Sequence, residues 1–513
     1  MQGHKPPSES SLFVYGDPYA RLPRSGFYEA LAKQLDLEWV REATRGLYAE
    51  GIGRPSLDPV VFVKLMLVGY FENLVGDSEL AFRVADSLTV RRFLGYGLGE
   101  PTPERTTILK CRQRWPIEVF EAIFSRVLAQ LAQHGLVKGE HLGTDTVLID
   151  ANASMDSLRH REFGCSYAEF VKALYAQPTG AAPAASEVAS KDAGRPGKAS
   201  NADWVSGTDP EAAVAVHPDG HTALSYRLDA TVDLETGAIV QIAAESGNVR
   251  DNVDLPQRLE EAQANLAELG LTPTALTADR GHHSAENIVE LETMGISPII
   301  RQRAQAGPAG FREQDFEYRG EEDEYRCPAG VRLTRRNCSP GPGRVHYRAE
   351  GDACRQCEHF GVCTKSTAGR SIVRTAHYEE VENNAQRVRS LEGRTLLGAH
   401  RQRAEGPWSY AKLYGGLARL GPRGLTNAWK KALIQGIGWN LMKLVARLTG
   451  LAPRGRSALA QLLAASIAYV RGISTQFDHA CVQIHIRLRL RRSRGYRYQT
   501  QSLSRRCLLS RGC

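Results

Sequence analysis

Apolar residues recur every three or four positions through most of the first 140 residues, a spacing that predicts amphipathic helices. The clearest case is Ile117 to His134, where the apolar positions form one continuous stripe that stops at Gly135. Asp58-Pro59 supplies a capping acid followed by proline, and this pair predicts a helix that begins there and runs through Val75. Residues 1–140 are therefore expected to form a helical N-terminal domain.

The spacing of apolar residues changes after this domain. From Leu142 to Ile149, apolar and polar residues alternate as they do in a β-strand. Asp145 lies inside this strand, and Asp150 follows five residues later, an odd separation that turns its side chain to the opposite face. The segment Leu158 to Leu174 is expected to be helical.

Further strands and helices follow in an order that favours a known type of sheet. The expected elements are a hairpin of strands at Thr222–Val232 and Ala238–Glu245, a helix at Leu255–Leu269, a strand at Thr274–Ala278, a helix at His283–Met294 and a strand at Ile296–Arg301. An antiparallel hairpin followed by alternating strands and helices is typical of a ribonuclease-H-like sheet. We therefore predict an α/β fold, with residues 141–301 as the first part of a ribonuclease-H-like core.

The remaining segments differ in composition. Residues 177–206 are rich in Ala, Gly, Pro and Ser and are expected to be a mobile linker. Residues 302–378 hold the cysteine cluster and interrupt the core, and residues 379–450 return to helical periodicity as its C-terminal part. Residues 451–513 form a basic tail that is expected to be poorly ordered.

Length and charge narrow the class of protein. A chain of 513 residues is too long for one ordinary core, and it has no apolar run of roughly 18 residues that would predict a membrane span. Because the N-terminus lacks the apolar stretch of a signal peptide, a cytoplasmic protein is expected. The tail carries twelve arginines and one acid, a net charge of +11, whereas the whole chain carries +8. This tail is either an electrostatic contact for nucleic acid or an overrun of the reading frame.

A short basic helix is expected from Thr106 to Trp115. Its cationic residues are Arg105, Lys110, Arg112 and Arg114. Two helices across a Gly/Pro turn, the second of them basic, suit a helix-turn-helix that reads DNA. The alternative is an ordinary helical domain with a solvated basic face. The pattern alone favours that alternative, because residues 26–139 hold 14 basic and 14 acidic residues.

Ten cysteines are present, and five of them lie between Cys327 and Cys363. Clustering in a chain without an export signal favours metal binding over disulfides. Cys327, followed by the closely spaced Cys354, Cys357 and Cys363, resembles a four-cysteine zinc knuckle. Cys338 and His359 are competing ligands, and reduced thiols without metal are the alternative.

Asp279 stands at the end of the short strand, before a glycine turn and a helix. A single acid there most often caps the next helix. Together, however, three stretches resemble the bacterial insertion-sequence transposases with a DDE catalytic triad. They are Gly143–Ser154 around Asp145, Ala278–Ser284 around Asp279, and a third motif in which Arg401, Glu405 and Lys412 have the family's spacing. The sequence departs from the family at two positions, His282 for an aromatic residue and Gly398 for a tyrosine.

This resemblance implies a metal-dependent phosphoryl transferase that acts on DNA. Asp145, Asp279 and Glu405 would hold two Mg²⁺ or Mn²⁺ ions, the hard cations that oxygen ligands prefer. Arg401 and Lys412 would grip DNA phosphates from one face of the helix that carries Glu405.

The implied partners are the terminal inverted repeats of the element and a target DNA, bound by a homodimer that assembles on DNA in the nucleoid. Two alternatives remain open. One is a catalytically inactive relic that still binds element ends, and the other is a ribonuclease-H-like nuclease without strand transfer.

Overall fold

The computed structural model describes residues 26–49, 56–175, 186, 190, 192–195, 198–302, 311–336, 344–375 and 377–451. All but the first residue of the predicted tail at 451–513, and half of the predicted linker at 177–206, lie outside these residues. Within the described part of the chain, no helix is both long enough and apolar enough to cross a membrane.

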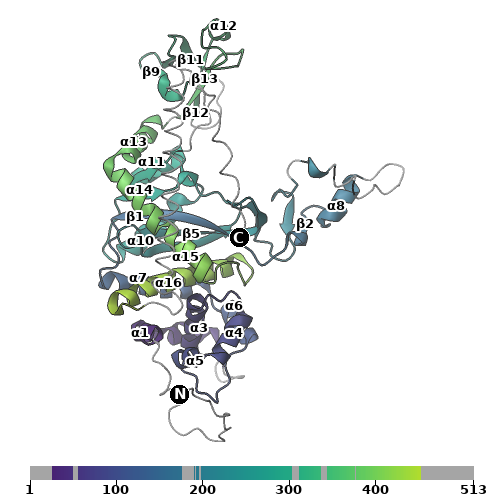
Figure 1. Cartoon of the computed structure of the whole chain (residues 1–513), viewed down its shortest axis with the longest axis vertical. Coiled ribbons are helices and arrows are strands. Elements are labelled where there is room, and N and C mark those ends of the chain that lie inside the picture. The colour runs from purple at the N-terminus through teal and green to yellow at the C-terminus, as the bar shows by residue number, and fades with distance from the viewer. Residues whose placement is uncertain are drawn as a thin grey trace, which may run out of the picture. The chain divides into compact units, whose positions relative to one another are not determined.

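The N-terminal region is helical, as its periodicity predicts (Figure 1). Its elements are α1 (Gly26–Gln34), α2 (Trp39–Thr44), the 3-10 turn η1 (Arg45–Leu47), α3 (Pro59–Phe71), α4 (Asp77–Asp86), α5 (Leu88–Leu94), α6 (Arg105–Arg114) and α7 (Ile117–Gln133). Asp58 caps α3, because its carboxylate accepts hydrogen bonds from the backbone N–H groups of Val60 and Val61. Gly95 ends α5 in the left-handed region at a φ of 87°, which glycine adopts without a steric penalty.

The largest sheet among the described residues has six strands and is called the central sheet below (Figure 1). Its strands are β1 (His141–Asp150), β4 (Ala213–Val216), β5 (Thr222–Asp233), β6 (Ile239–Ser246), β7 (Ala275–Ala278) and β8 (Ser297–Ile300). The strands lie in the order β4-β5-β1-β7-β8, and β6 also pairs with β5. Pairing is antiparallel from β4 and β6 through β5 to β1, and parallel from β1 through β7 to β8.

Helices cover this sheet and join it to the N-terminal region. They are α10 (Leu255–Ala267), α11 (Ala285–Thr293), α13 (Tyr378–Arg389), α14 (Leu391–Arg403), α15 (Glu405–Tyr414) and α16 (Leu425–Thr449). Helix α10 packs on β6, α13 on β8, and α14 on β7 and β1. Helix α16 packs against β6 on the sheet and against α7 of the N-terminal region. One continuous apolar core therefore runs through the N-terminal helices and the central sheet.

The prediction of a helix from Leu158 to Leu174 is wrong for its first part. The segment starts as strand β2 (Leu158–His160), which follows the short turn η2 (Met155–Ser157) and pairs with β3 (Trp204–Ser206). Only α8 (Tyr167–Leu174) is helical. The buried Trp204 packs against the ring of His160, and this contact with a residue far along the chain decides the conformation. The end of the predicted linker is therefore a strand.

A second sheet of five strands occupies the cysteine-containing stretch between β8 and α13. It contains η4 (Glu313–Asp315), β9 (Glu317–Arg319), β10 (Glu324–Arg326), β11 (Arg332–Arg336), β12 (Arg344–Ala349), α12 (Gly351–Arg355) and β13 (Ser371–Thr375). Each strand pairs antiparallel with the strand before it in the chain. This cysteine-rich sheet has a small core of its own, separate from the central one.

Candidate active site

The register of β1 against β7 brings Asp145 and Asp279 together. Thr144 pairs with Ala278, the last residue of β7, in this parallel ladder, so the next residues are Asp145 in β1 and Asp279 just after β7. Cross-strand neighbours point to the same face of a sheet. Asp279 also caps the turn η3 (Arg280–His282), where its carboxylate accepts a hydrogen bond from the Gly281 N–H at 2.8 Å. It is thus both a capping residue and the neighbour of Asp145.

Helices α14 and α15 cover the face of the sheet that carries these two aspartates. The Nδ1 atom of His400 on α14 lies 2.9 Å from the Thr277 hydroxyl on β7. The indole N–H of Trp408 on α15 donates to the Asp145 carbonyl at 3.2 Å. Gly143 permits this close cover, because a Cβ there would lie 2.7 Å from Leu234 and 3.0 Å from His400 Nδ1.

Glu405 is the first residue of α15, beside this covered face. The expectation that Arg401, Glu405 and Lys412 share one helix needs correction, because α14 ends at Arg403 and Ala404 separates it from α15. Pro407 explains the interruption, since it lacks the N–H that would bond to the Arg403 carbonyl. Arg401 therefore lies on α14, and Lys412 lies in the last turn of α15.

The three carboxylates influence one another. Burial, together with the charges of Asp279 and Glu405, raises the pKa of Asp145 to about 7. Burial also raises the pKa of Glu405. The charge of Arg401 opposes this rise, and the charge of Asp279 adds to it. The pKa of Asp279 is lowered instead, chiefly by its hydrogen bond with His282. Such a gathering of like charges favours a bound cation.

The carboxylates are spaced more widely than a closed metal cluster. Across the described ranges, two groups of residues have possible ligand atoms that all lie within 4.8 Å of one another. These are Asp150 with His217 and His221, and Glu140 with His141 and Glu235; the three acids of the triad are not among them.

Two histidines that were not predicted as site residues touch the aspartate strands. His282, noted in the sequence as a departure from the family, is buried, and its Nδ1 lies 3.0 Å from the Asp279 carboxylate. Burial lowers the pKa of His400 to about 4, which keeps its ring neutral near pH 7. No spacing in the sequence indicated His400, because its contact with Thr277 spans 123 residues.

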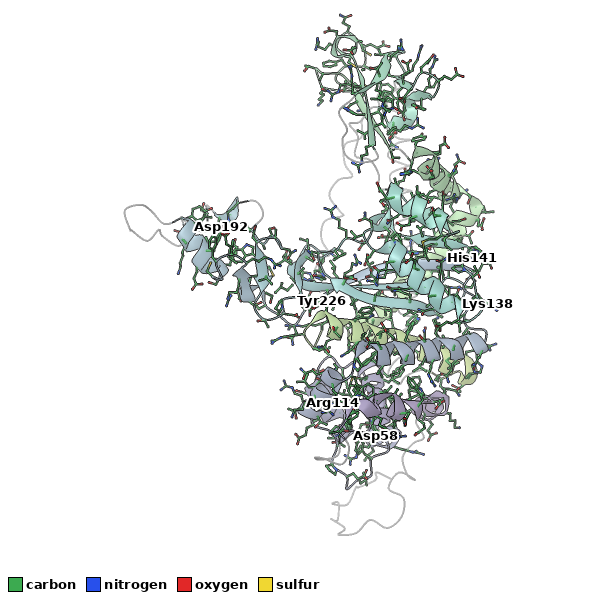
Figure 2. All side chains as sticks on the ribbon, turned by 180° about the vertical axis from the view of Figure 1, so that it is seen from behind. Asp58, Arg114, Lys138, His141, Asp192 and Tyr226 are labelled. Atoms are coloured by element: carbon green, nitrogen blue, oxygen red, sulfur yellow. The ribbon has the colours of Figure 1, made fainter. Side chains whose placement is uncertain are left out.

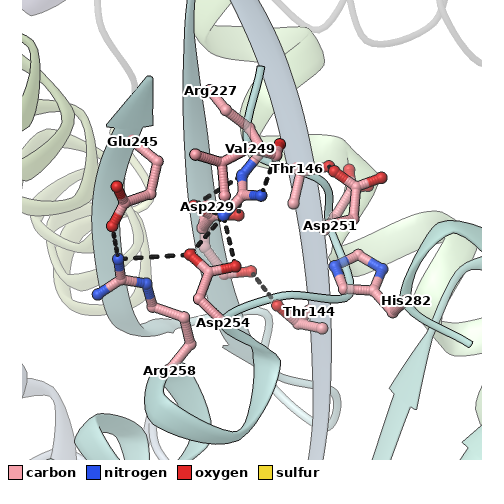
Figure 3. A network of polar contacts seen from close by, with 12 residues as sticks. Thr144, Thr146, Arg227, Asp229, Glu245, Val249, Asp251, Asp254, Arg258 and His282 are labelled. Atoms are coloured by element: carbon pink, nitrogen blue, oxygen red, sulfur yellow. Dashed lines mark hydrogen bonds and ion pairs between the residues drawn. The ribbon is translucent and has the colours of Figure 1, made fainter. Parts of the chain in front are cut away.

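A polar network lies beside the opposite face of β1 (Figure 3). The Thr146 hydroxyl donates to Asp251 at 3.0 Å. The same Asp251 carboxylate would clash with a Cβ at Gly281, so it lies close to the turn after β7. Arg227 holds the loop before α10 by donating to the Val249 carbonyl and to Asp254. Asp251 is thus a further acid near the site that the sequence did not reveal.

The cations predicted to contact DNA fall into two groups. Arg401, Lys412, Arg105 and Lys110 are exposed. Arg114, labelled in Figure 2, is also exposed. Its guanidinium lies 4.8 Å from the centre of the Tyr48 ring. Arg112 differs, because it forms two hydrogen bonds of 2.7 and 2.6 Å with Asp77 and its side chain is only 11% exposed. This ion pair joins α6 to α4, so the structure gives Arg112 a packing role that the prediction of DNA contact overlooked.

The cysteines predicted to bind zinc line a common cavity. Cys327, Cys354, Cys357 and Cys363 all border it, as does His359. Their sulfurs are unpaired thiols, and burial together with the other three cysteines raises the pKa of Cys363. Backbone N–H groups of Val331 and Arg370 point at the sulfurs of Cys327 and Cys354. Cys338 lies outside the described residues.

Family models match three parts of the chain. A model described as "Transposase domain (DUF772)" matches residues 17–114, and two models described as "Transposase DDE domain" match residues 197–341 and 326–445. Asp279 and Glu405 lie inside the matched segments, and Asp145 lies in the gap between the first segment, 17–114, and the second, 197–341. These matches identify the class as the DDE transposases. Within that class, the chain belongs to the insertion-sequence type.

Other comparisons add little. No curated protein matches the sequence. One similar solved structure is the cryo-EM structure of a piggyBac transposase synaptic complex with hairpin DNA, at 10% identity over 86% of this chain and 77% of that chain. Its TM-score of 0.28 is too low to indicate a common fold.

Proposed function

We propose that this chain is the transposase of a bacterial insertion sequence that binds the terminal inverted repeats and catalyses metal-dependent strand cleavage and strand transfer. The observation that carries the proposal is the register of β1 against β7, which makes Asp145 on β1 a neighbour of Asp279, the residue just after β7. Helices α14 and α15 pack over the same face, and Glu405 is the first residue of α15. The three acids come from distant parts of the chain: Asp145 lies in β1, Asp279 caps the turn after β7, and Glu405 begins α15.

The strand order supports a ribonuclease-H-like core. Three antiparallel strands, β6, β5 and β1, are followed across the sheet by the parallel strands β7 and β8. This arrangement agrees with the order expected from the sequence. In it, the first strand lies at the centre of the sheet and carries the first acid.

The acids suit two Mg²⁺ or Mn²⁺ ions. The raised pKa of Asp145 reflects burial beside two other carboxylates, an environment that a divalent cation would relieve. When bound, two such ions activate an attacking oxygen and stabilise the leaving oxygen at phosphorus. Asp145, Asp279 and Glu405 would be the residues that hold these ions.

Other residues of the chain would position these groups and the DNA. His282 orients the Asp279 carboxylate through the contact of 3.0 Å. Arg401 lies close enough to Glu405 to lower its pKa, so it can meet a phosphate beside the acids. The exposed cations of α6, Arg105, Lys110 and Arg114, are the proposed contacts of the N-terminal region with DNA.

We further propose that Cys327, Cys354, Cys357 and Cys363 hold a structural Zn²⁺ ion. Four thiols around one cavity match the ligand set of a closed zinc site. Backbone N–H groups directed at two of the sulfurs would stabilise the thiolates that zinc requires.

The function is tested with purified full-length protein and DNA fragments from both sides of the reading frame, where inverted repeats are expected. We expect cleavage at the element ends and joining of the freed 3′ ends to target DNA, both dependent on Mg²⁺ and abolished by a chelator. The Asp279→Asn variant should bind the ends without cutting them, and the exposed Asp203→Asn should serve as a matched control.

The alternatives give different results in the same assay. End binding by the wild-type protein without any cleavage would indicate an inactive relic. Metal-dependent cleavage without joining would indicate a nuclease. Either result would overturn the proposed strand transfer.

A further inference from the structure

Three possible metal ligands meet where β1 ends, away from the acidic triad. Asp150 is the last residue of β1, and it pairs in register with Ser225 on β5. His217 and His221 flank the turn that joins β4 to β5. A backbone hydrogen bond of 2.8 Å from His217 N–H to the His221 carbonyl closes this turn, and Gly220 occupies its left-handed position at a φ of 90°. The turn thereby places both imidazoles beside Asp150.

The distances between these ligand atoms fit a tetrahedral metal ion. The Nε2 atoms of His217 and His221 each lie 3.2 Å from the same oxygen of Asp150. All three ligand atoms lie within 4.8 Å of one another. Zinc bound by ligands at about 2.1 Å in a tetrahedron would separate neighbouring ligand atoms by about 3.4 Å. The two distances to Asp150 are therefore already close to what the ion requires.

Neighbouring residues orient the ligands. Asp219 contacts Nδ1 of His221 at 2.6 Å, which leaves Nε2 as the atom directed at Asp150. The Ser225 hydroxyl lies 2.8 Å from Nε2 of His217, on the buried side of the group. The two rings stack with centroids 4.0 Å apart, so binding would require a small rotation of one ring. His221 can rotate, because its side chain is 46% exposed.

We propose that Asp150, His217 and His221 form a binding site for a divalent transition-metal ion of the Zn²⁺ type. Two imidazoles and one carboxylate favour zinc over Mg²⁺, because Mg²⁺ prefers oxygen ligands alone. The site is distinct from the triad, since strand alternation directs Asp150 and Asp145 to opposite faces of β1. The ion ties the tip of the β4–β5 hairpin to the end of the strand that carries Asp145, and it leaves a fourth position for water.

The site is tested by metal titration of the full-length protein after dialysis against a chelator. The variant is His221→Gln, which removes one exposed ligand and keeps a similar volume. The control is His134→Gln, an exposed histidine at the end of α7 that is not part of the group. A second variant, Asp219→Asn, removes only the residue that orients His221. Thermal unfolding of the metal-free proteins verifies that all of them fold.

We expect wild-type protein and His134→Gln to bind one more equivalent of Zn²⁺ than His221→Gln. Asp219→Asn should bind this equivalent about 10- to 100-fold more weakly. With Co²⁺ in place of Zn²⁺, this equivalent should produce ligand-field absorption without the thiolate charge-transfer band, which distinguishes it from a metal on the cysteines.

Equal stoichiometry and affinity in wild type and His221→Gln would overturn the proposal. In that case the contacts with Asp150 would be hydrogen bonds of the two imidazoles and not a metal site. DNA cleavage is not used as a readout, so the result does not depend on the proposed transposase activity.

Discussion

The central sheet and the cysteine-rich sheet are built in opposite ways. In the central sheet, the neighbouring strands β1 and β7 come from distant parts of the chain. The Thr277 hydroxyl on β7 donates to the Leu142 carbonyl on β1, 135 residues away in the sequence. In the cysteine-rich sheet, every strand pairs with the strand just before it. The first arrangement brings acids from distant segments together, whereas the second brings together only residues that are close in the sequence.

The cores of the two sheets differ as well. The central sheet shares one apolar core with the N-terminal helices and α16. The core of the cysteine-rich sheet is a handful of buried residues: Phe316, Tyr325, Leu333, Tyr347, Ala349, Cys354 and Ile372. Small cores rarely stabilise a fold without a disulfide or a metal. The comparison teaches that the acids rely on packing across a large core, and that the proposed zinc ion would matter most for the small sheet.

The largest expected effect comes from removing the chemistry of the central sheet without disturbing its packing. Asp145→Asn keeps the shape of the side chain and removes its charge. We expect cleavage to fall by at least about 10²–10³-fold, the scale seen when one group that stabilises a transition state is lost. DNA binding should survive, as measured by gel shift on the same fragment. Cleavage close to the wild-type rate would exclude Asp145 as a metal ligand.

The next effect concerns the cysteine-rich sheet. Cys354→Ser removes a buried proposed zinc ligand, and we expect residues 311–375 to lose protection from proteases while the central sheet keeps it. The matched control is Cys165→Ser, which makes the same change at a free thiol outside this sheet. Elemental analysis should find bound zinc in wild type and in the control. Substoichiometric zinc with freely titrating thiols would refute the structural site.

Paired leucine substitutions sharpen the contrast between the two cores. Leu276→Ala in β7 and Leu333→Ala in β11 each remove a fully buried side chain, at a cost of about 2–5 kcal/mol. Hydrogen exchange followed segment by segment should show that Leu276→Ala lowers the protection of backbone amides across the central sheet and the N-terminal helices. For Leu333→Ala, the loss of protection should stay within residues 311–375. Equal loosening of the central sheet by Leu333→Ala would contradict separate cores.

A smaller effect follows from the pKa of Asp145. Because the folded pKa, about 7, exceeds the ordinary value of 3.8, the folded state holds this proton more tightly than the unfolded chain does. The resulting stability is present below about pH 4 and is lost as the pH rises toward 7. Metal-free Asp145→Asn should therefore be more stable than wild type at pH 8 and little different at pH 4.

Urea unfolding in the presence of a chelator measures this difference. Asp156→Asn, which changes an exposed aspartate, is the control and should show no such dependence on pH. A stability difference of equal size at pH 4 and pH 8 would assign the effect to packing and not to the charge of Asp145.

The smallest effect is expected at Asp150. Asp150→Asn should keep measurable cleavage in the assay used for Asp145→Asn, because its side chain faces the histidine group and not Asp279. If cleavage disappeared in Asp150→Asn and persisted in Asp145→Asn, the assignment of the first catalytic acid to one face of β1 would be wrong.

The sequence by itself determined the features that depend on neighbouring residues. Asp58-Pro59 starts α3, the apolar stripe after Ile117 produces α7, and the alternation after Leu142 produces β1. The family motifs also indicated Asp145, Asp279 and Glu405 as a group. These signals act within a few residues or within one short motif, so they can be recognised in the chain before it folds.

Only the tertiary structure decided which distant residues meet. It paired Arg112 with Asp77, placed His400 against Thr277, and brought His217 and His221 to Asp150. It also converted Leu158–His160 into a strand through its pairing with β3. The physical reason is that each of these contacts depends on strand register and helix packing across the whole core, and no local spacing in the sequence specifies those.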